Sequence, residues 1–133
     1  MFKFVKSLSG RSFQTPVVLP STASETYTDG EGLVLTSGAL TKVGATAKPA
    51  YICGEAYVAP ASDNKDIVAY PVLPQHVYET TFAAAGTSIT IGSKVTLHTD
   101  GAQITATTTS GVAYITKKLG TGASGTAAHV RFI

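Results

Sequence analysis

Apolar and polar side chains alternate between Ile89 and Ala106, on both sides of the pair Asp100-Gly101. Asp-Gly favours a two-residue type I′ turn, because both central positions of that turn need positive φ angles. Side chains point to alternate faces of a strand, so this turn gives the ribbon one apolar and one polar face. The pattern predicts a β-hairpin that lies on a hydrophobic core. Its register places Thr99 opposite Ala102, Leu97 opposite Ile104 and Val95 opposite Ala106, and puts Thr96, His98, Gln103 and Thr105 on the polar face.

An earlier segment, residues 33–43, repeats this pattern imperfectly around Ser37-Gly38. Its apolar positions are shifted by one residue relative to the later hairpin. Since a shift of one residue moves side chains to the other face, the segment is either buried on both faces or joined by a turn longer than two residues. With a two-residue turn, the facing pairs are Leu35 with Leu40 and Val34 with Thr41.

The rest of the chain consists of short apolar or alternating segments separated by turn residues, without an amphipathic helical pattern. Ala83–Gly86 is long enough for one helical turn at most. Pro71 and Pro74 lack the N–H of a central strand, so the end of the predicted strand at residues 67–74 belongs at an edge or a bulge. About ten short strands predict an all-β fold, a small single-domain β-barrel or sandwich. The other predicted strands are residues 17–20, 25–28, 51–58, 77–82, 112–115 and 127–133. In residues 51–58 the alternation puts Ile52, Ala56 and Val58 on one face and Tyr51, Cys53, Glu55 and Tyr57 on the other. In residues 127–133 it directs Ala128, Val130 and Phe132 inward and His129 and Arg131 outward.

Residues 1–15 combine basic and aromatic side chains, and the first acidic residue of the chain is Glu25. One interpretation is an edge strand whose aromatic side chains pack on the core of the domain itself. The other is an extended arm that docks onto a partner, since terminal segments are loose unless something ties them down. We predict the arm over residues 1–15 and the β domain over residues 16–133. The candidate residues for a capsid or subunit interface are Phe2, Lys3, Phe4, Lys6, Arg11 and Phe13.

Composition narrows the class of protein. The 133 residues suffice for one domain, and only 14% of them are charged, which is commoner in proteins that pack into assemblies than in free enzymes. The net charge of +2 is too small to predict a nucleic acid or membrane partner. Cys53 is the single cysteine and cannot form an internal disulfide, and the basic start of the chain makes a poor signal peptide. We expect a protein that is made in the cytoplasm and used without secretion.

The sequence shows no arrangement typical of catalysis. His76, His98 and His129 are far apart and not at metal-ligand spacing. The glycine-rich segment 120–125 lacks the lysine and the following helix of a phosphate-binding loop. Cys53 has no neighbouring base or cation to activate it. We therefore predict no catalytic residues, no metal, no cofactor and no small-molecule substrate.

Several of the segments above, taken together, resemble the small capsid decoration, or cement, proteins of tailed bacteriophages. The resemblance covers most of residues 25–133 as an order of strands and turns, and the basic, aromatic start is not part of it. The segments that carry it are Gly32–Leu40, Ile67–Pro74, Val77–Thr80, Ile91–Gly101 and Val130–Phe132.

The resemblance implies a structural virion protein with a β-barrel-like domain. Such proteins are often trimeric and sit on the outer surface of the assembled head, where they clamp neighbouring subunits of the major capsid protein. A trimer makes several weak contacts at once, and avidity then raises the overall affinity. The alternative is a phage fibre or spike module that recognises a host-surface glycan through a face of tyrosines, Tyr51, Tyr57, Tyr70 and Tyr78.

Overall fold

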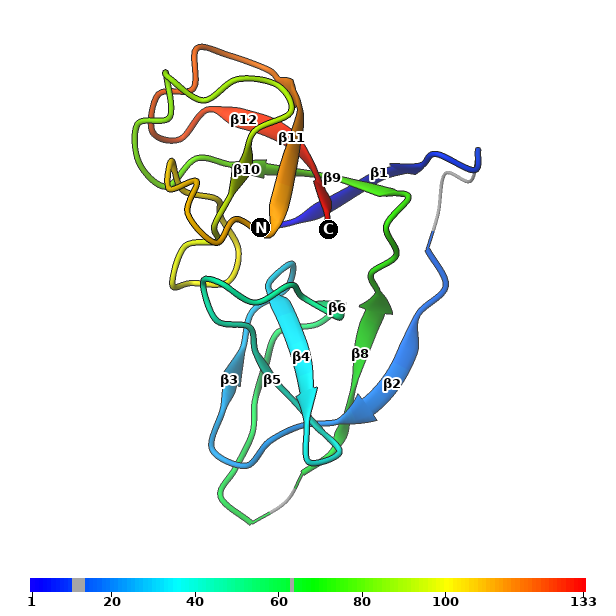
Figure 1. Cartoon of the computed structure of the whole chain (residues 1–133). Helices are drawn as coiled ribbons and strands as arrows, with labels where there is room; N and C mark the ends of the chain where they lie inside the picture. Colours follow the sequence, from blue (N-terminus) through cyan, green and yellow to red (C-terminus); the bar gives the residue numbers. More distant parts are fainter. Residues whose placement is uncertain (11–13, 63) are drawn as a thin grey trace.

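The computed structural model describes residues 1–10, 14–62 and 64–133, which form twelve strands in three antiparallel sheets and no helix (Figure 1). Sheet A, the upper sheet in Figure 1, has the order β1 (Lys3–Ser7), β9 (His76–Thr81), β12 (Ala127–Phe132), β11 (Ala113–Lys118) and β10 (Lys94–Val95). Sheet B, the lower sheet, has the order β2 (Val17–Pro20), β8 (Asp66–Pro71), β6 (Tyr51–Cys53), β4 (Gly32–Thr36) and β5 (Ala39–Lys42). The third sheet pairs β3 (Thr26–Tyr27) with β7 (Tyr57–Val58).

The all-β prediction is confirmed. The sheets do not close into a barrel. Of the two predicted architectures, barrel and sandwich, the structure is therefore compatible with the sandwich. In the described part of the chain, one β-bridge joins the two edges of sheet B, between Ser21, which follows β2, and Leu40 of β5. Figure 1 shows both ends of the chain between sheets A and B.

The buried side chains form two clusters, and β6 contributes to both. Ile52 belongs to the cluster beneath sheet A, with Tyr78, Phe82 and Phe132, while its neighbour Cys53 belongs to the cluster of sheet B. The alternation predicted for residues 51–58 therefore holds at Ile52 and Cys53, but both of these side chains are buried. The strand ends at Cys53, and at the following Gly54 a Cβ atom would lie 2.8 Å from the Tyr70 ring and 2.9 Å from the Val68 side chain.

The N-terminal segment is strand β1, at the edge of sheet A. It pairs with β9, and Phe2 is only 3% exposed, with its ring edge-to-face against Phe132 at 5.2 Å between centroids. The Phe4 ring packs edge-to-face against His76 at 5.2 Å. The predicted extended arm is therefore wrong for residues 2–7, because burying an aromatic side chain contributes roughly 2 kcal/mol or more, which a free arm would forgo. Two of the arm's predicted interface residues, Arg11 and Phe13, lie outside the described residues.

The earlier hairpin has the two-residue turn at Ser37-Gly38, with φ angles of 51° and 84°. Leu35 pairs with Leu40, as that turn requires. The base of β4 is buried on both faces, since Leu33 belongs to the cluster of sheet B and Val34 packs against the cluster beneath sheet A. The first of the two open interpretations is therefore confirmed at the base of the hairpin, whereas Leu35, towards its tip, is 45% exposed.

The later hairpin keeps the predicted pairing of Leu97 with Ile104 but has a different turn. Only Gly101 has a positive φ, 67°, and the Asp100 carboxylate accepts hydrogen bonds from the N–H groups of Ala102 and Gln103 at 2.8 and 3.1 Å. The type I′ turn is thus wrong, because the Asp100 side chain stabilises a longer loop over residues 99–102. Val95 pairs with Ala113 of β11 and not with Ala106.

Candidate functional site

The outer face of sheet A carries a concentration of positive charge. Strand β12 alternates as predicted, with Val130 and Phe132 buried beneath the sheet and His129 and Arg131 on the other side. The register of the sheet aligns the outward residues of four strands in a row, Lys3, Glu79, His129 and Lys117. A second row on this face contains Tyr114 of β11, which pairs with Arg131 of β12 on one side and Lys94 of β10 on the other. Lys6 of β1 pairs with Val77 of β9. We define the basic face as Lys3, Lys6, Lys94, Lys117 and Arg131, together with His129 and Glu79.

The basic face holds half of the ten lysine and arginine residues of the chain. Its one carboxylate among the described residues, that of Glu79, lies 3.3 Å from His129 Nε2. Arg131 donates a hydrogen bond from Nε to the carbonyl of Pro74 at 2.9 Å, and the Lys94 ammonium lies 5.2 Å from the centre of the Tyr114 ring. Five cations against one carboxylate give this side of the molecule a positive potential.

A shallow cavity of about 300 Å³ opens on the basic face. Leu8, at 56% exposure, is its most exposed apolar residue, whereas Val77 is only 3% exposed. The cavity therefore combines apolar contact surface with cations from three strands. Its lining consists of Lys6, Leu8, Val77, Thr116, Lys117, His129 and Arg131.

The four predicted interface residues that the structure describes divide between two faces. Lys3 and Lys6 lie on the basic face, whereas Phe2 is buried and Phe4 is half-buried on the inner side of β1. The structure thus brings the two lysines together with residues that the sequence interpretation missed, Lys94, Lys117 and Tyr114. Besides Lys3 and Lys6 in the basic start of the chain, the outward alternation of His129 and Arg131 was a signal for this face in the sequence.

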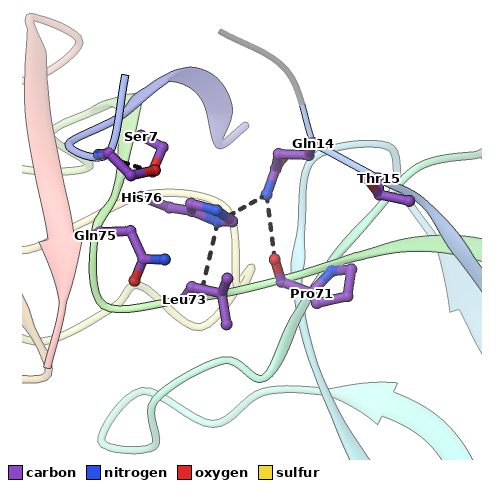
Figure 2. A pocket seen from close by; sticks show the side chains of 8 residues that line it. Ser7, Gln14, Thr15, Pro71, Leu73, Gln75 and His76 are labelled. Carbon is purple, nitrogen blue, oxygen red and sulfur yellow. Dashed lines mark hydrogen bonds between the residues drawn. The ribbon is translucent and has the colours of Figure 1, made fainter. Parts of the chain in front are cut away.

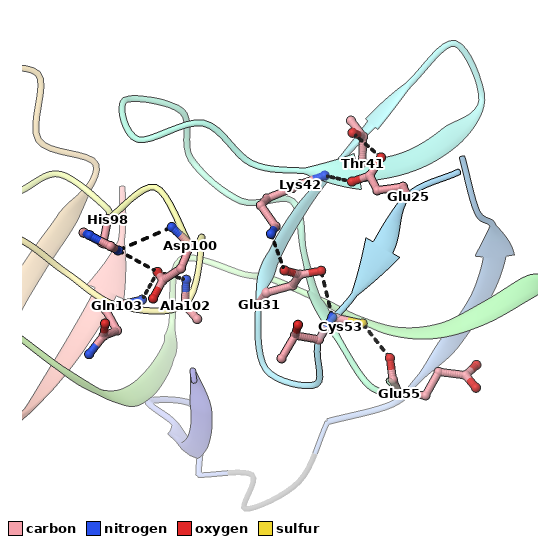
Figure 3. A network of polar contacts seen from close by, with 11 residues as sticks. Glu25, Glu31, Thr41, Lys42, Cys53, Glu55, His98, Asp100, Ala102 and Gln103 are labelled. Atoms are coloured by element: carbon pink, nitrogen blue, oxygen red, sulfur yellow. Dashed lines mark hydrogen bonds and ion pairs between the residues drawn. The ribbon is translucent and has the colours of Figure 1, made fainter. Parts of the chain in front are cut away.

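Most acidic residues belong to the other half of the chain. Six of the eight fall between Glu25 and Asp66. The carboxylate of Glu25 accepts hydrogen bonds from Thr41 Oγ1 and the Lys42 N–H, and Glu55 accepts one from the Val68 N–H (Figure 3 shows Glu25, Glu31 and Glu55). These carboxylates stabilise the connections of sheet B, and their position makes the charge of the molecule one-sided.

Glu31 is a fully buried carboxylate at the start of β4. Its Oε1 accepts a hydrogen bond from the Thr28 N–H at 3.0 Å, and its Oε2 lies 3.3 Å from the Lys42 ammonium without a hydrogen bond (Figure 3). Burial raises the pKa of Glu31, and the Thr28 hydrogen bond and Lys42 offset this only in part. The ionised side chain therefore costs stability.

A Glu31→Gln variant is expected to reverse this cost at neutral pH, since it keeps an acceptor for the Thr28 N–H and removes the buried charge. Because the pKa of Glu31 is raised above its ordinary value of 4.5, the folded protein binds this proton at pH values where the unfolded chain has lost it. The free energy of unfolding of the wild type, relative to the variant, is therefore highest below pH 4.5 and falls as the pH rises through the raised pKa. Urea unfolding of both proteins across this range measures the effect, and a wild type that gains stability relative to the variant as the pH rises would contradict the assignment.

A second cavity, of about 500 Å³, lies where the N-terminal segment meets β8 and β9 (Figure 2). Gln14 Nε2 donates to the Pro71 carbonyl at 3.2 Å and to Tyr78 Oη at 2.7 Å, and lies 3.2 Å from His76 Nδ1. The Leu73 N–H donates to the same His76 nitrogen. Burial lowers the pKa of His76 and raises that of Tyr78, so both are neutral near pH 7. This cluster ties Gln14 to sheet A and contains no activated nucleophile.

The remaining sequence candidates do not form a reactive centre within the described ranges. Cys53 is buried, donates from Sγ to the Glu55 carbonyl at 3.0 Å, and burial raises the pKa of its thiol to about 11. In residues 1–10, 14–62 and 64–133, no group of three or more His, Cys, Asp or Glu side chains is placed to hold a metal ion. The same residues contain no helix long and apolar enough to cross a membrane.

The four tyrosines of the glycan hypothesis do not share one exposed face. Tyr78 is fully buried beneath sheet A, and Tyr51 and Tyr57 pack against the cluster of sheet B. The Tyr57 ring stacks on Tyr27 at 6.5 Å and is covered by the Lys65 ammonium at 4.5 Å from its centre. These rings stabilise the fold and leave the basic face as the candidate functional surface.

No protein-family model and no curated protein matches the chain. The basic face is the feature of the structure that points to a function.

Proposed function

We propose that this chain is a structural protein of a tailed-bacteriophage virion, a decoration protein that binds the outside of the assembled head. One observation carries the proposal beyond the resemblance, namely that a charge-poor protein gathers half of its basic side chains on one sheet face. A protein that sits on a larger surface needs one side that attracts this surface. The basic face supplies this attraction and orients the molecule during association.

In this proposal the protein acts as a homotrimer that contacts several major capsid subunits. Each copy presents one basic face, and three copies on a local three-fold axis bind with an avidity far above the affinity of one. Contacts that bridge neighbouring capsid subunits would stabilise the shell against internal pressure, and the protein requires no catalytic step for this role.

Co-sedimentation with phage heads tests the proposal. Heads of the phage that encodes the chain, purified without this protein, are mixed with it at about micromolar concentration and pelleted. We expect saturable binding to mature heads, and failure to co-sediment would overturn the proposal. The absolute mass of the protein in solution, with and without heads, tests the trimer separately, because a monomer in both states would contradict it.

A further inference from the structure

In the part of the chain that the structure describes, the lysine and arginine side chains of the basic face have no ion-pair partner. Within the described residues, no carboxylate lies within ion-pair distance of Lys3, Lys6, Lys94, Lys117 or Arg131. Arg131 uses only its Nε in a hydrogen bond, to the Pro74 carbonyl, so its terminal nitrogens are free of protein partners in this part of the chain. Like charges on one face repel one another, and an anionic partner would relieve that repulsion.

Apolar surface lies among these cations. Leu8 is 56% exposed at the cavity of about 300 Å³, which Val77 also lines between Lys6 and Arg131. A leucine-sized side chain fits a space of this volume, and burial of such a side chain contributes roughly 1.5 to 3 kcal/mol. The cavity thus adds an apolar anchor to an electrostatic surface.

This combination favours a protein partner over a nucleic acid. Binding of single-stranded nucleic acid relies on aromatic side chains that stack on bases, and the one aromatic ring in the two rows of the face, Tyr114, is covered by Lys94. A phosphate group gains no favourable apolar contact with the exposed Leu8. A carboxylate-rich segment with an apolar residue satisfies both the cations and the cavity.

We propose that the basic face binds an acidic, extended segment of a protein partner, and that the cavity beside Leu8 takes an apolar side chain of this segment. The inference rests on the proposed function, since it identifies the partner as an acidic segment exposed on the capsid shell. Carboxylates of the segment bind Lys6, Lys117 and Arg131, and its apolar residue contacts Leu8 and Val77.

Charge-reversal variants test the inference on heads. Lys117→Glu is expected to weaken binding by about tenfold or more, because it places like charges against each other at the interface. Lys48→Glu is the matched control, since Lys48 is an exposed lysine of the sheet B half with no ion pair in the described residues, and we expect wild-type binding. Leu8→Ala should weaken binding without changing its salt dependence, whereas Lys117→Glu should reduce that dependence.

A probe without capsid separates the failure of this inference from the failure of the proposed function. The probes are a glutamate-rich peptide with one central leucine, its leucine-to-alanine counterpart, duplex DNA and inorganic phosphate. We expect the leucine peptide to bind the wild type most tightly and to bind Lys117→Glu weakly. If the protein fails to bind heads but binds the leucine peptide tightly and Lys117→Glu binds it weakly, the decoration function is overturned and the acidic-segment site is supported. If heads bind the wild type and Lys117→Glu equally, or if DNA or phosphate binds more tightly than the peptide, the acidic-segment site is overturned.

Discussion

Replacing Phe2 by alanine is expected to lower the free energy of unfolding by about 3 to 5 kcal/mol. The Phe2 ring is 3% exposed and packs edge-to-face against Phe132 at 5.2 Å and against Tyr78 at 6.4 Å. Its N–H also donates to the Gly30 carbonyl at 2.7 Å, which joins the start of the chain to the segment before β4. Truncation of the ring leaves a cavity between sheets that only partly collapses.

Urea unfolding measures this loss, with Leu8→Ala as the control from the same segment. Leu8 is 56% exposed, so its truncation should change the free energy of unfolding by no more than about 0.5 kcal/mol. Similar small effects at Phe2 and Leu8 would indicate that the segment is a loose arm after all. The large loss expected at Phe2 also means that deletion of residues 1–15 removes part of the core and cannot test binding alone.

Gly111→Ala is expected to cost about 2 to 3 kcal/mol. A Cβ atom at this position would lie 2.6 Å from the carbonyl carbon of Lys94 and 2.7 Å from the amide nitrogen of Val95. Both are backbone atoms of β10, which cannot move aside like a flexible side chain. The strand would have to separate from β11 and from Val112 just before it, whose N–H donates to the Val95 carbonyl at 2.9 Å.

Gly44→Ala is the matched control for this substitution. No atom lies within 4 Å of a Cβ built at Gly44, and its backbone is not in the left-handed region. An alanine there should leave the free energy of unfolding unchanged or raise it by less than about 1 kcal/mol, since it restricts the unfolded chain. Thermal and urea unfolding of both variants compare them directly, and equal stability would contradict the close approach of β10 to Gly111.

Local features of the fold were predictable because they depend on neighbouring residues. The Ser37-Gly38 turn and the inward positions of Val130 and Phe132 follow from turn preference and alternation, and both are confirmed. The Asp100-Gly101 turn was predicted wrongly because the same residue pair supports two geometries. In the structure the Asp100 carboxylate, by binding two N–H groups of the loop, selects the longer one.

The pairing of distant strands was not predictable from alternation. Strand β1 pairs with β9, and β9 with β12, across long separations in sequence. These pairings decide that the start of the chain is buried and not free. Cys53, predicted on the face opposite Ile52, is buried as well because β6, which pairs with β4 and β8, lies between the two clusters.

The candidate site depends on the same long-range pairings. The sequence drew attention to Lys3 and Lys6, but their alignment with Lys117 and Arg131 exists only once four strands are assembled. In the sequence these cations are spread over both ends of the chain, and the net charge of +2 conceals them. The one-sided distribution of charge is a property of the folded protein, and the net charge of the chain does not report it.

A three-dimensional reconstruction of phage heads saturated with this protein tests the central proposal most directly. The proposal implies a tailed phage that encodes the chain, and the heads used are those of this phage, purified without the protein. We predict added density on the outer surface at local three-fold positions, with the basic face of sheet A directed at the shell. Heads without added density, or density in which sheet B contacts the shell and the basic face points to solvent, would contradict the proposal.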